Sequence, residues 1–305
     1  MEKIGILVIG SSNTDMMIRT RHLPMPGETI LGGEFIMNPG GKGANQAVAA
    51  SRLKGEVTFV AKVGNDIFGR EAIKGLKEQG IDTRFVTINN GIASGMALIM
   101  VDDKGENCIS VASGANMSLQ KSDIDNVREL IEQASFLLVQ LEIPLDSVAY
   151  AIELAKQVET KVVLNPAPAQ PLPDDLLAAI HIITPNETET ALLTGIEVEG
   201  EVSARKAAKA LRNKGVDIVV ITMGVHGAYV LSDEVDQIIT SPKVKAVDTT
   251  AAGDTFNGAL LVGLSDGLSL IDAIKFANKA AAFSVTKIGA QASAPNKNDL
   301  NKINN

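Results

Sequence analysis

The 305-residue sequence contains one cysteine, no tryptophan and only two tyrosines. A lone cysteine, Cys108, excludes an internal disulfide and is typical of a reducing compartment, so we expect a cytoplasmic location. Acidic residues outnumber basic ones by 36 to 28 and no Lys/Arg cluster occurs, which disfavours nucleic acid as a partner. No apolar run approaches membrane-spanning length, so we expect no membrane partner.

Several common catalytic signatures are also missing. The run GGKGAN, residues 40–45, has Gly43 where a P-loop needs Ser or Thr, and no G-x-G-x-x-G dinucleotide fingerprint occurs. The histidines His22, His181 and His226 are scattered, and with one cysteine they form no metal-ligand spacing. No G-x-S-x-G elbow is present. These absences exclude the corresponding nucleotide, zinc and hydrolase sites.

Short β-rich runs alternate with helical stretches over most of the chain. The expected strands span residues 4–9, 57–63, 136–141, 161–164, 180–184 and 218–222, and the expected helices span residues 43–53, 69–79, 145–157 and 204–214. Strand and helix in repetition predict an α/β fold, in which a mainly parallel sheet is covered by helices on both faces.

Two stretches interrupt this alternation, residues 28–41 and residues 94–114. In the second, two β-rich runs flank the turn DDKGEN, which is typical of a hairpin. A small antiparallel sheet beside a parallel one suggests a lid over a cleft. A peripheral edge hairpin explains the same pattern equally well.

The segment DTTAAGDTFNGA, residues 248–259, places one carboxylate inside a run of small residues. Ala252 and Gly253 predict a tight turn into the apolar helix that follows, and exposed N–H groups at a helix start attract anions. If a hydroxyl attacks phosphorus there, Asp254 is the base, and the N–H groups of the Ala252–Asp254 turn stabilise the developing charge.

The segment NPGGKGANQAVAASRL, residues 38–53, begins with a glycine-rich turn and continues as a buried helix. Its glycines allow backbone N–H groups to approach a polar ligand, for which Lys42 and Asn45 supply further donors. The alternative is a glycine turn that only precedes a core helix.

The segment GSSNTD, residues 10–15, follows the first expected strand. Ligands of open α/β sheets bind beyond the carboxyl ends of strands, where Asn13 and Asp15 can hydrogen-bond a polyol. Asp15 would accept from two adjacent hydroxyls. An Asx-type turn is the alternative interpretation.

The segment ITPNETE, residues 183–189, also follows an expected strand. Asn186 and Glu189 lie on one face of the helix that begins here, a spacing that suits Mg²⁺ and its water ligands. A helix N-cap with acidic first-turn residues explains Asn186 and Glu187 as well.

The two glycine-containing motifs, residues 38–53 and 248–259, resemble the two signatures of the phosphofructokinase-B (PfkB) sugar-kinase family. The match covers nearly the whole chain and is closest to the ribose-phosphorylating members, through GSSNTD, QLEIP, LNPAPA, ITPNETE and KIGAQASAP. The resemblance implies one kinase domain over residues 1–305, with a Rossmann-like, mainly parallel sheet flanked by helices. It also implies a small antiparallel β-lid, inserted as segments of about 14–38 and 94–112, that forms a homodimer interface.

The same resemblance implies transfer of the ATP γ-phosphate to O5 of D-ribose and assigns residues to each ligand. Residues expected at the sugar are Asn13, Asp15, Gly41, Lys42, Asn45 and Glu142, with Asp254 as base beside Ala252 and Gly253. Residues expected at the nucleotide are Asn186, Thr222, Gly224, Gly227, Gly253 and Asn278, with Mg²⁺ at Asn186 and Glu189. Residues expected at an activating K⁺ are Asp248, Thr250, Ser284, Gly289 and Ser293.

The sequence departs from the family pattern at a few positions. Ile288 and Ala292 stand where the family has a basic residue and a proline. Backbone carbonyls supply most of the K⁺ ligands in the family, so we expect the site to be kept but its affinity for K⁺ to differ. Thr14 and Met96 are expected near the sugar, where they would shift preference toward a deoxy or related pentose.

Three alternatives remain open. A deoxyribose kinase, or another sugar kinase of the family, would use the same base. A nucleoside kinase is disfavoured because a nucleoside acceptor calls for aromatic stacking, and the chain has no tryptophan. A non-catalytic sugar-sensing protein is a different class of function. Loss of Asp254 or of the Gly253 turn would indicate that class, but both are present in the sequence.

Overall fold

The main sheet of the computed structural model, which describes residues 5–303, has nine strands in the order β13-β12-β11-β10-β9-β8-β1-β4-β5. All neighbouring strands are parallel except that β12 is antiparallel to both β11 and β13. The strands are β1 (Ile6–Ile9), β4 (Val57–Gly64), β5 (Val86–Asn89), β8 (Phe136–Val139), β9 (Lys161–Leu164), β10 (Ile182–Ile183), β11 (Ile218–Thr222), β12 (Ala228–Leu231) and β13 (Asp236–Ile239). The predicted α/β fold with a mainly parallel sheet is confirmed.

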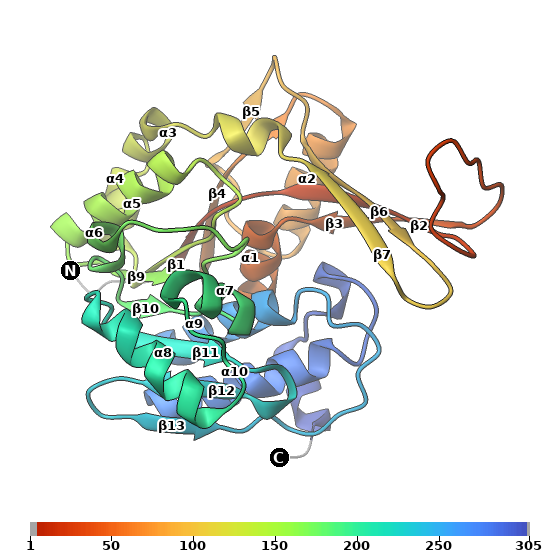
Figure 1. Cartoon of the computed structure of the whole chain (residues 1–305). Helices are drawn as coiled ribbons and strands as arrows, with labels where there is room; N and C mark the ends of the chain where they lie inside the picture. The colour runs from red at the N-terminus through yellow and green to blue at the C-terminus, as the bar shows by residue number, and fades with distance from the viewer. Residues whose placement is uncertain (1–4, 304–305) are drawn as a thin grey trace.

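Helices cover both faces of this sheet (Figure 1). They are α1 (Lys42–Arg52), α2 (Ile67–Glu78), α3 (Lys121–Asp125), α4 (Arg128–Gln133), α5 (Leu145–Gln157), α6 (Asp174–Leu177), α7 (Glu187–Thr194), α8 (Glu201–Asn213), α9 (Ala252–Ser265) and α10 (Leu270–Ser284). Successive strand residues point to opposite faces, so Leu7 and Ile9 pack with α5 and α8, whereas Ile6 and Val8 pack with α1, α9 and α10. The sheet therefore separates two apolar cores.

The predicted element boundaries agree closely with the structure. The helix expected over residues 145–157 has the bounds of α5, and the other predicted helices are displaced by one to three residues. The first strand was expected to begin at Ile4, which lies outside the described residues. The expected strand 180–184 shortens to β10, although Thr184 N still donates to Leu164 O at 3.0 Å and extends the ladder by one rung.

A second sheet, here called the lid sheet, has four strands in the order β3-β2-β6-β7. They are β2 (Asn13–Arg19), β3 (Glu34–Gly40), β6 (Gly95–Val101) and β7 (Asn107–Ala112). Two antiparallel pairs, β2 with β3 and β6 with β7, are joined by a parallel pairing of β2 with β6. The lid sheet projects from the body of the molecule, and the loop of residues 20–33, red in Figure 1, extends beyond it.

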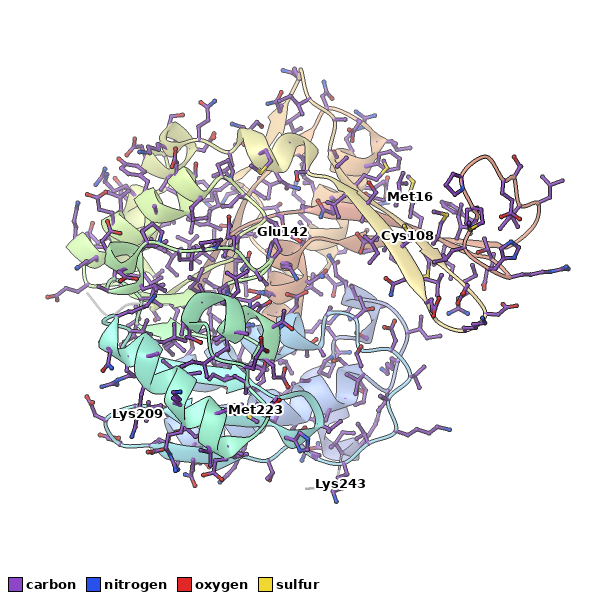
Figure 2. The ribbon with its side chains drawn as sticks, viewed as in Figure 1. Met16, Cys108, Glu142, Lys209, Met223 and Lys243 are labelled. Carbon is purple, nitrogen blue, oxygen red and sulfur yellow. The ribbon has the colours of Figure 1, made fainter. Side chains whose placement is uncertain are left out.

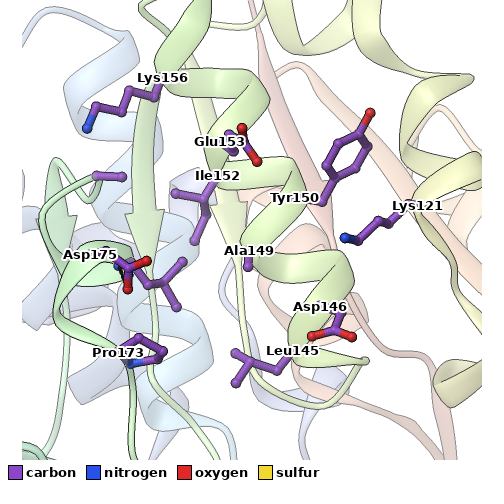
Figure 3. Close-up of a pocket in the computed structure, with 12 residues that line it drawn as sticks. Lys121, Leu145, Asp146, Ala149, Tyr150, Ile152, Glu153, Lys156, Pro173 and Asp175 are labelled. Atoms are coloured by element: carbon purple, nitrogen blue, oxygen red, sulfur yellow. Dashed lines mark hydrogen bonds between the residues drawn. The ribbon is translucent and has the colours of Figure 1, made fainter.

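Short 3₁₀ helices complete the chain: η1 (Gly114–Ser118), η2 (Gly224–His226), η3 (Gln291–Ser293) and η4 (Lys297–Lys302). Across residues 5–303, the helices are too short or too polar for any of them to traverse a bilayer. A surface groove beside α5 is lined by residues such as Lys121, Tyr150 and Asp175 (Figure 3). It mixes acidic and basic side chains and includes none of the residues that the sequence motifs single out.

Candidate active site

The first turn of α9 has the geometry that its small residues predict. Ala251, the N-cap, adopts the left-handed conformation with φ 57°, which is uncommon for a residue with a Cβ and marks a constrained turn. A Cβ placed on Gly253 would meet no atom within 4 Å, so the space beside this turn is open.

Two of the three N–H groups expected to bind an anion are available. Ala252 N donates to Thr249 O at 3.2 Å, so it is not free, which corrects the expectation for this residue. Within residues 5–303, Gly253 N and Asp254 N have no hydrogen-bond acceptor. An anion at this turn would therefore meet the N–H groups of Gly253 and Asp254.

The Asp254 carboxylate is buried and paired on both oxygens. Oδ2 accepts from Asn45 Nδ2 at 3.0 Å and Oδ1 accepts from Gln46 Nε2 at 2.9 Å. Burial raises the pKa of Asp254, whereas the Lys42 ammonium and the two amide donors lower it, and the net shift is upward. The carboxylate is thus oriented in advance and is a stronger proton acceptor than an exposed one.

Gln46 connects this carboxylate to a buried polar chain. Gln46 Nε2 also donates to Asn165 Oδ1 at 2.9 Å, and Asn165 Nδ2 donates to Thr184 O at 3.2 Å. Thr184 Oγ1 donates to Asn257 Oδ1 at 2.7 Å, and Asn257 Nδ2 donates to Gly253 O at 2.8 Å. These hydrogen bonds therefore link the Asp254 carboxylate to the turn that carries the free N–H groups.

Two further carboxylates, Asp15 and Glu142, lie close enough to act on the base. Burial, followed by the negative charges of Glu142 and Asp254, raises the pKa of Asp15 to about 6. Glu142 Oε2 accepts from Ser11 Oγ and from Lys42 N, the latter at 3.0 Å. Glu142 lies in the middle of the molecule, where the lid sheet meets the body (Figure 2).

Glycines allow the lid sheet to approach the body at this point. Gly41 has φ 88°, and a Cβ there would lie 2.7 Å from Asn13 N. A Cβ on Gly40 would lie 2.2 Å from Asp15 Oδ2, so the Asp15 carboxylate rests against a backbone without a side chain. Glycine is therefore required at position 41, and a side chain at position 40 would displace the Asp15 carboxylate.

The residues expected at the sugar are brought together from four parts of the chain. They are Asn13 and Asp15 of β2, Gly41, Lys42 and Asn45 at the start of α1, Glu142 after β8, and Asp254 of α9. The expectation for Thr14 and Met96 is wrong: they pair with each other across β2 and β6, and strand alternation places them on the face opposite to Asp15.

Asn186 and Glu189 form a reciprocal capping box at the start of α7. Asn186 Oδ1 accepts from Glu189 N and Glu189 Oε2 accepts from Asn186 N, both at 2.8 Å. Burial raises the pKa of Glu189, and the negative charge of Asp254 raises it further. The hydrogen bond from Asn186 N and the positive charge of Lys42 lower this pKa, but the net shift is upward. The helix-cap interpretation is thus realised, and Glu189 also lies near the base. In the described part of the chain, Glu189 Oε1 has no hydrogen-bond partner.

The residues expected at the nucleotide lie at the end of β11 and on α10. Thr222 bridges to Asn186, and Gly224 and Gly227 have φ 52° and 91° in the turn around η2. Asn278 Nδ2 donates to Ile239 O at 2.8 Å and to Thr240 O at 3.3 Å, so this side chain braces the strand end against α10. A groove lies beside these carbonyls, lined by residues that include Ile239, Thr240, Ser241, Pro242, Phe276 and Lys279.

The residues expected at a K⁺ ion converge only in part. Asp248 Oδ1 accepts from Thr250 N and Oδ2 accepts from Gly289 N, both at 2.9 Å. The hydroxyls of Ser284 and Ser293 donate to Ala281 O and Ala290 O within their own turns. Between residues 5 and 303 there is no group of three or more His, Cys, Asp or Glu side chains arranged to hold a metal ion.

Three contact residues of this site were missed from the sequence. Gln46 belongs to a motif that was identified, and its signal is an amide on the buried face of an otherwise apolar helix. Ser11 holds Glu142 and is part of GSSNTD. Asn116, in η1, donates to Asn13 Oδ1 at 2.7 Å, and the sequence around it carries no signal that connects it to β2.

A family model described as pfkB family carbohydrate kinase matches residues 3–297. A curated ribokinase of Haemophilus influenzae is 46% identical over 294 residues, which cover 96% of both chains. A deoxyribokinase of Salmonella typhi is 38% identical over 98% of both chains. The solved structure of Arabidopsis thaliana ribokinase complexed with ribose and ATP matches with a TM-score of 0.92 and 32% identity, covering 99% of this chain and 98% of that one. The chain belongs to the pfkB carbohydrate kinase family.

Proposed function

We propose that the protein transfers the γ-phosphate of ATP to O5 of D-ribose. The observation that carries this proposal is the position of a buried, pre-oriented carboxylate, Asp254, beside two N–H groups without acceptors. Asp15 and Glu142 lie near this carboxylate and supply acceptors for sugar hydroxyls. The similarity to ribokinases, one of them complexed with ribose and ATP, supports the choice of substrates.

The chemistry follows from this arrangement. Asp254 takes the proton of the sugar hydroxyl while the hydroxyl oxygen forms a bond to the γ-phosphorus. The bond between that phosphorus and the oxygen bridging it to the β-phosphorus breaks, and ADP leaves with the bridging oxygen. The N–H groups of Gly253 and Asp254 stabilise the charge that builds up on the transferred phosphoryl group. Base and anion site belong to one turn, so acceptor and donor are aligned.

A divalent cation fits beside α7. Glu189 combines a buried carboxylate with one unpaired oxygen, and Asn186 lies next to it, which provides the hard oxygen donors that Mg²⁺ prefers. When bound with ATP, Mg²⁺ neutralises phosphate charge. We assign the groove at Thr240 and Asn278 to the nucleotide base.

A monovalent cation is proposed at Asp248. The hydrogen bond from Gly289 N holds the segment 284–293 beside this carboxylate. Burial acts to raise the pKa of Asp248, but the hydrogen bonds from Gly289 and Thr250 and the charge of Arg19 outweigh it and hold that pKa below its usual value. An ionised carboxylate and nearby backbone carbonyls suit K⁺. The ion would fix the turn before Ala251 without contact with substrate.

The lid sheet is proposed to close over the sugar and to pair two copies of the chain. Four side chains, Ile18, Phe35, Met37 and Leu98, form an apolar surface on the face opposite to Asp15, and each is 42–59% exposed. Light scattering should report a dimer that Phe35→Glu converts to monomer, whereas Ile109→Glu on the other face should remain dimeric.

The free Cys108 is consistent with a cytoplasmic protein.

A deoxyribose kinase is the second candidate, favoured by the 38% identity to a deoxyribokinase. ADP release should be measured against ribose, 2-deoxyribose, fructose and adenosine, with kcat/KM highest for ribose. A higher value for 2-deoxyribose would select the second candidate. Binding of a sugar without any ADP release would indicate a sensing protein and would contradict the proposed function.

A further inference from the structure

Asn116 lies where the lid sheet joins the body. Asn13, the first residue of β2, pairs with Gly40 on one side and Gly95 on the other, and these three residues form the first rung of the lid sheet. Asn116 approaches this rung from η1, which follows β7, and is only 1% exposed. The segments at which β2 and β6 enter the lid sheet therefore meet at one buried amide.

The hydrogen bonds around Asn116 determine the orientation of two amides. The backbone N–H of Ser12 can only donate, and it donates to Asn116 Oδ1 at 2.9 Å. The other end of the Asn116 amide is therefore its NH₂ group, which donates to Asn13 Oδ1 at 2.7 Å. Because the Asn13 oxygen is occupied in this way, Asn13 presents its NH₂ group on its other side.

That NH₂ group is free and reaches solvent. Within residues 5–303, Asn13 Nδ2 has no hydrogen-bond partner. It is also not among the fully buried unpaired side-chain atoms, which are Asn45 Oδ1, Thr83 Oγ1 and Gln140 Oε1. Asn13 lies on the same face of β2 as Asp15, so the free donor lies on the side of the lid sheet that carries the Asp15 carboxylate.

Gly95 allows this arrangement. A Cβ there would lie 2.1 Å from Asn13 Oδ1 and 2.3 Å from Asn116 Nδ2, so any side chain would separate the two amides. The space beside Gly95 is therefore filled by the hydrogen bond between Asn116 and Asn13, and no side chain fits there.

We propose that Asn116 is a positioning residue that fixes Asn13 as a hydrogen-bond donor toward an oxygen of the sugar. The inference rests on the proposed sugar site and deepens it. The ionised Asp15 carboxylate can only accept hydrogen bonds, and the free NH₂ group of Asn13 can only donate them. The two side chains therefore require a hydroxyl hydrogen at one position of the ligand and an oxygen lone pair at a neighbouring one. The site accordingly selects a neutral polyol that offers one hydroxyl as acceptor and others as donors.

Asn13→Asp tests the donor directly, because a carboxylate keeps the bond from Asn116 and the shape of the side chain but cannot donate. Asn116→Asp tests the positioning: the new carboxylate still accepts from Ser12 N, and its second oxygen favours rotation of the Asn13 amide, which turns the Asn13 oxygen toward the proposed sugar position. Asn116→Ala removes the constraint without reversing it. Ser147→Ala, which deletes a buried 2.8 Å hydrogen bond to Leu119 O just beyond η1, is the matched control.

At pH 8, ribose and ATP KM values are measured for all four variants. We expect Asn13→Asp and Asn116→Asp to raise the ribose KM by roughly 10-fold or more, the effect of one unmade hydrogen bond to a ligand, with the ATP KM unchanged. Asn116→Ala should raise the ribose KM less than Asn116→Asp, and Ser147→Ala should leave both KM values unchanged. A merely structural role predicts the reverse order, because alanine loses both hydrogen bonds and leaves a cavity.

An unchanged ribose KM in Asn13→Asp, or a larger effect of Asn116→Ala than of Asn116→Asp, would overturn the inference. If the variants at position 116 do not fold, Asn13→Asp alone decides it. If the wild type releases no ADP with any sugar, the proposed function has failed separately. Calorimetric titration of ribose into the wild type and Asn13→Asp then decides the inference, which is overturned if the affinities are equal or the wild type binds no ribose.

Discussion

Asp254 and Asp15 lie close enough for their charges to interact, and they belong to two parts of the molecule that are built differently. Asp254 lies in a helix packed in the core, and amide groups of α1 donate to both its oxygens. Asp15 lies on the lid sheet, where the neighbouring strands expose large apolar side chains, and in the described chain its carboxylate receives no hydrogen bond. The proposed base is therefore oriented before any ligand arrives, whereas the lid carboxylate is left unpaired for the hydroxyls that we propose it accepts.

This difference separates chemistry from recognition. Groups that act in the transition state benefit from a rigid frame, because no reorganisation is needed during the reaction. Groups that bind substrate can be carried by a small sheet of marginal stability, which gains from the ligand it covers. Changes in the core should thus affect turnover, and changes in the lid sheet should affect sugar affinity.

Asp254→Asn should give the largest effect. The substitution keeps the size of the side chain but removes the proton acceptor, so kcat should fall by about 10²–10⁴, the usual contribution of a positioned base. Ribose and ATP KM values should change little. Turnover within a few-fold of the wild type would contradict the assignment of the base.

Gln46→Leu should lower kcat by about 10- to 100-fold, because the carboxylate loses a donor that holds it in the orientation for proton transfer. The Gln46 amide, like Asn45 and Lys42, lowers the pKa of Asp254, so its loss raises that pKa. Because only the ionised carboxylate accepts the proton, the acidic limb of the kcat–pH profile should move to higher pH.

Gln140→Leu is the matched control for this change. Gln140 Nε2 donates to Gln46 Oε1 at 2.6 Å but does not contact the base. The control should lose stability without a shift in the pH profile. Equal pH profiles for both variants would show that Gln46 only fills space.

Asp15→Asn should weaken sugar binding but stabilise the folded protein. The ribose KM should rise by roughly 5- to 50-fold, because an amide offers one acceptor atom where the carboxylate offers two, and the ATP KM should not change. Thermal stability should increase at pH 8 by roughly 2–4 °C, since burial of the ionised carboxylate near Glu142 opposes folding.

The sign of this pH dependence follows from the raised pKa. Burial and the charges of Glu142 and Asp254 raise the pKa of Asp15 to about 6, against 3.8 for an exposed aspartate, so the folded state retains the proton to higher pH than the unfolded chain does. Stability of the wild type should fall as pH rises from about 4 to 6, and the gain from Asp15→Asn should vanish near pH 4. Calorimetric scans at pH 4 and 8 check both; an equal gain at the two pH values would contradict the assignment.

Replacement of Na⁺ by K⁺ at constant ionic strength should give the smallest effect, a several-fold increase in kcat through a better-ordered anion site. Asp248→Ala should abolish the difference between the two ions. An enzyme indifferent to K⁺ would contradict the cation site, and Ile288 and Ala292 would be the first residues to revert toward the family pattern.

The sequence predicted the local features well because their causes are local. The turn before α9 follows from Ala252 and Gly253, and the β6–β7 hairpin follows from the turn DDKGEN. The contacts that orient the site are not local. Gln46 meets Asn165 from 119 residues away and Asn116 meets Asn13 from 103 residues away, and no neighbouring residue signals either pair.

The parallel pairing of β2 with β6 constrains how the lid sheet can be exchanged between proteins. A lid made of one hairpin would be a single insertion that could be moved as a cassette. Here the central ladder joins two separate insertions, whose register is set by the first rung of Asn13 and Gly95. A chimaera that takes one insertion from a relative must therefore match the strand register of the other, and engineering of sugar preference through this sheet calls for paired grafts.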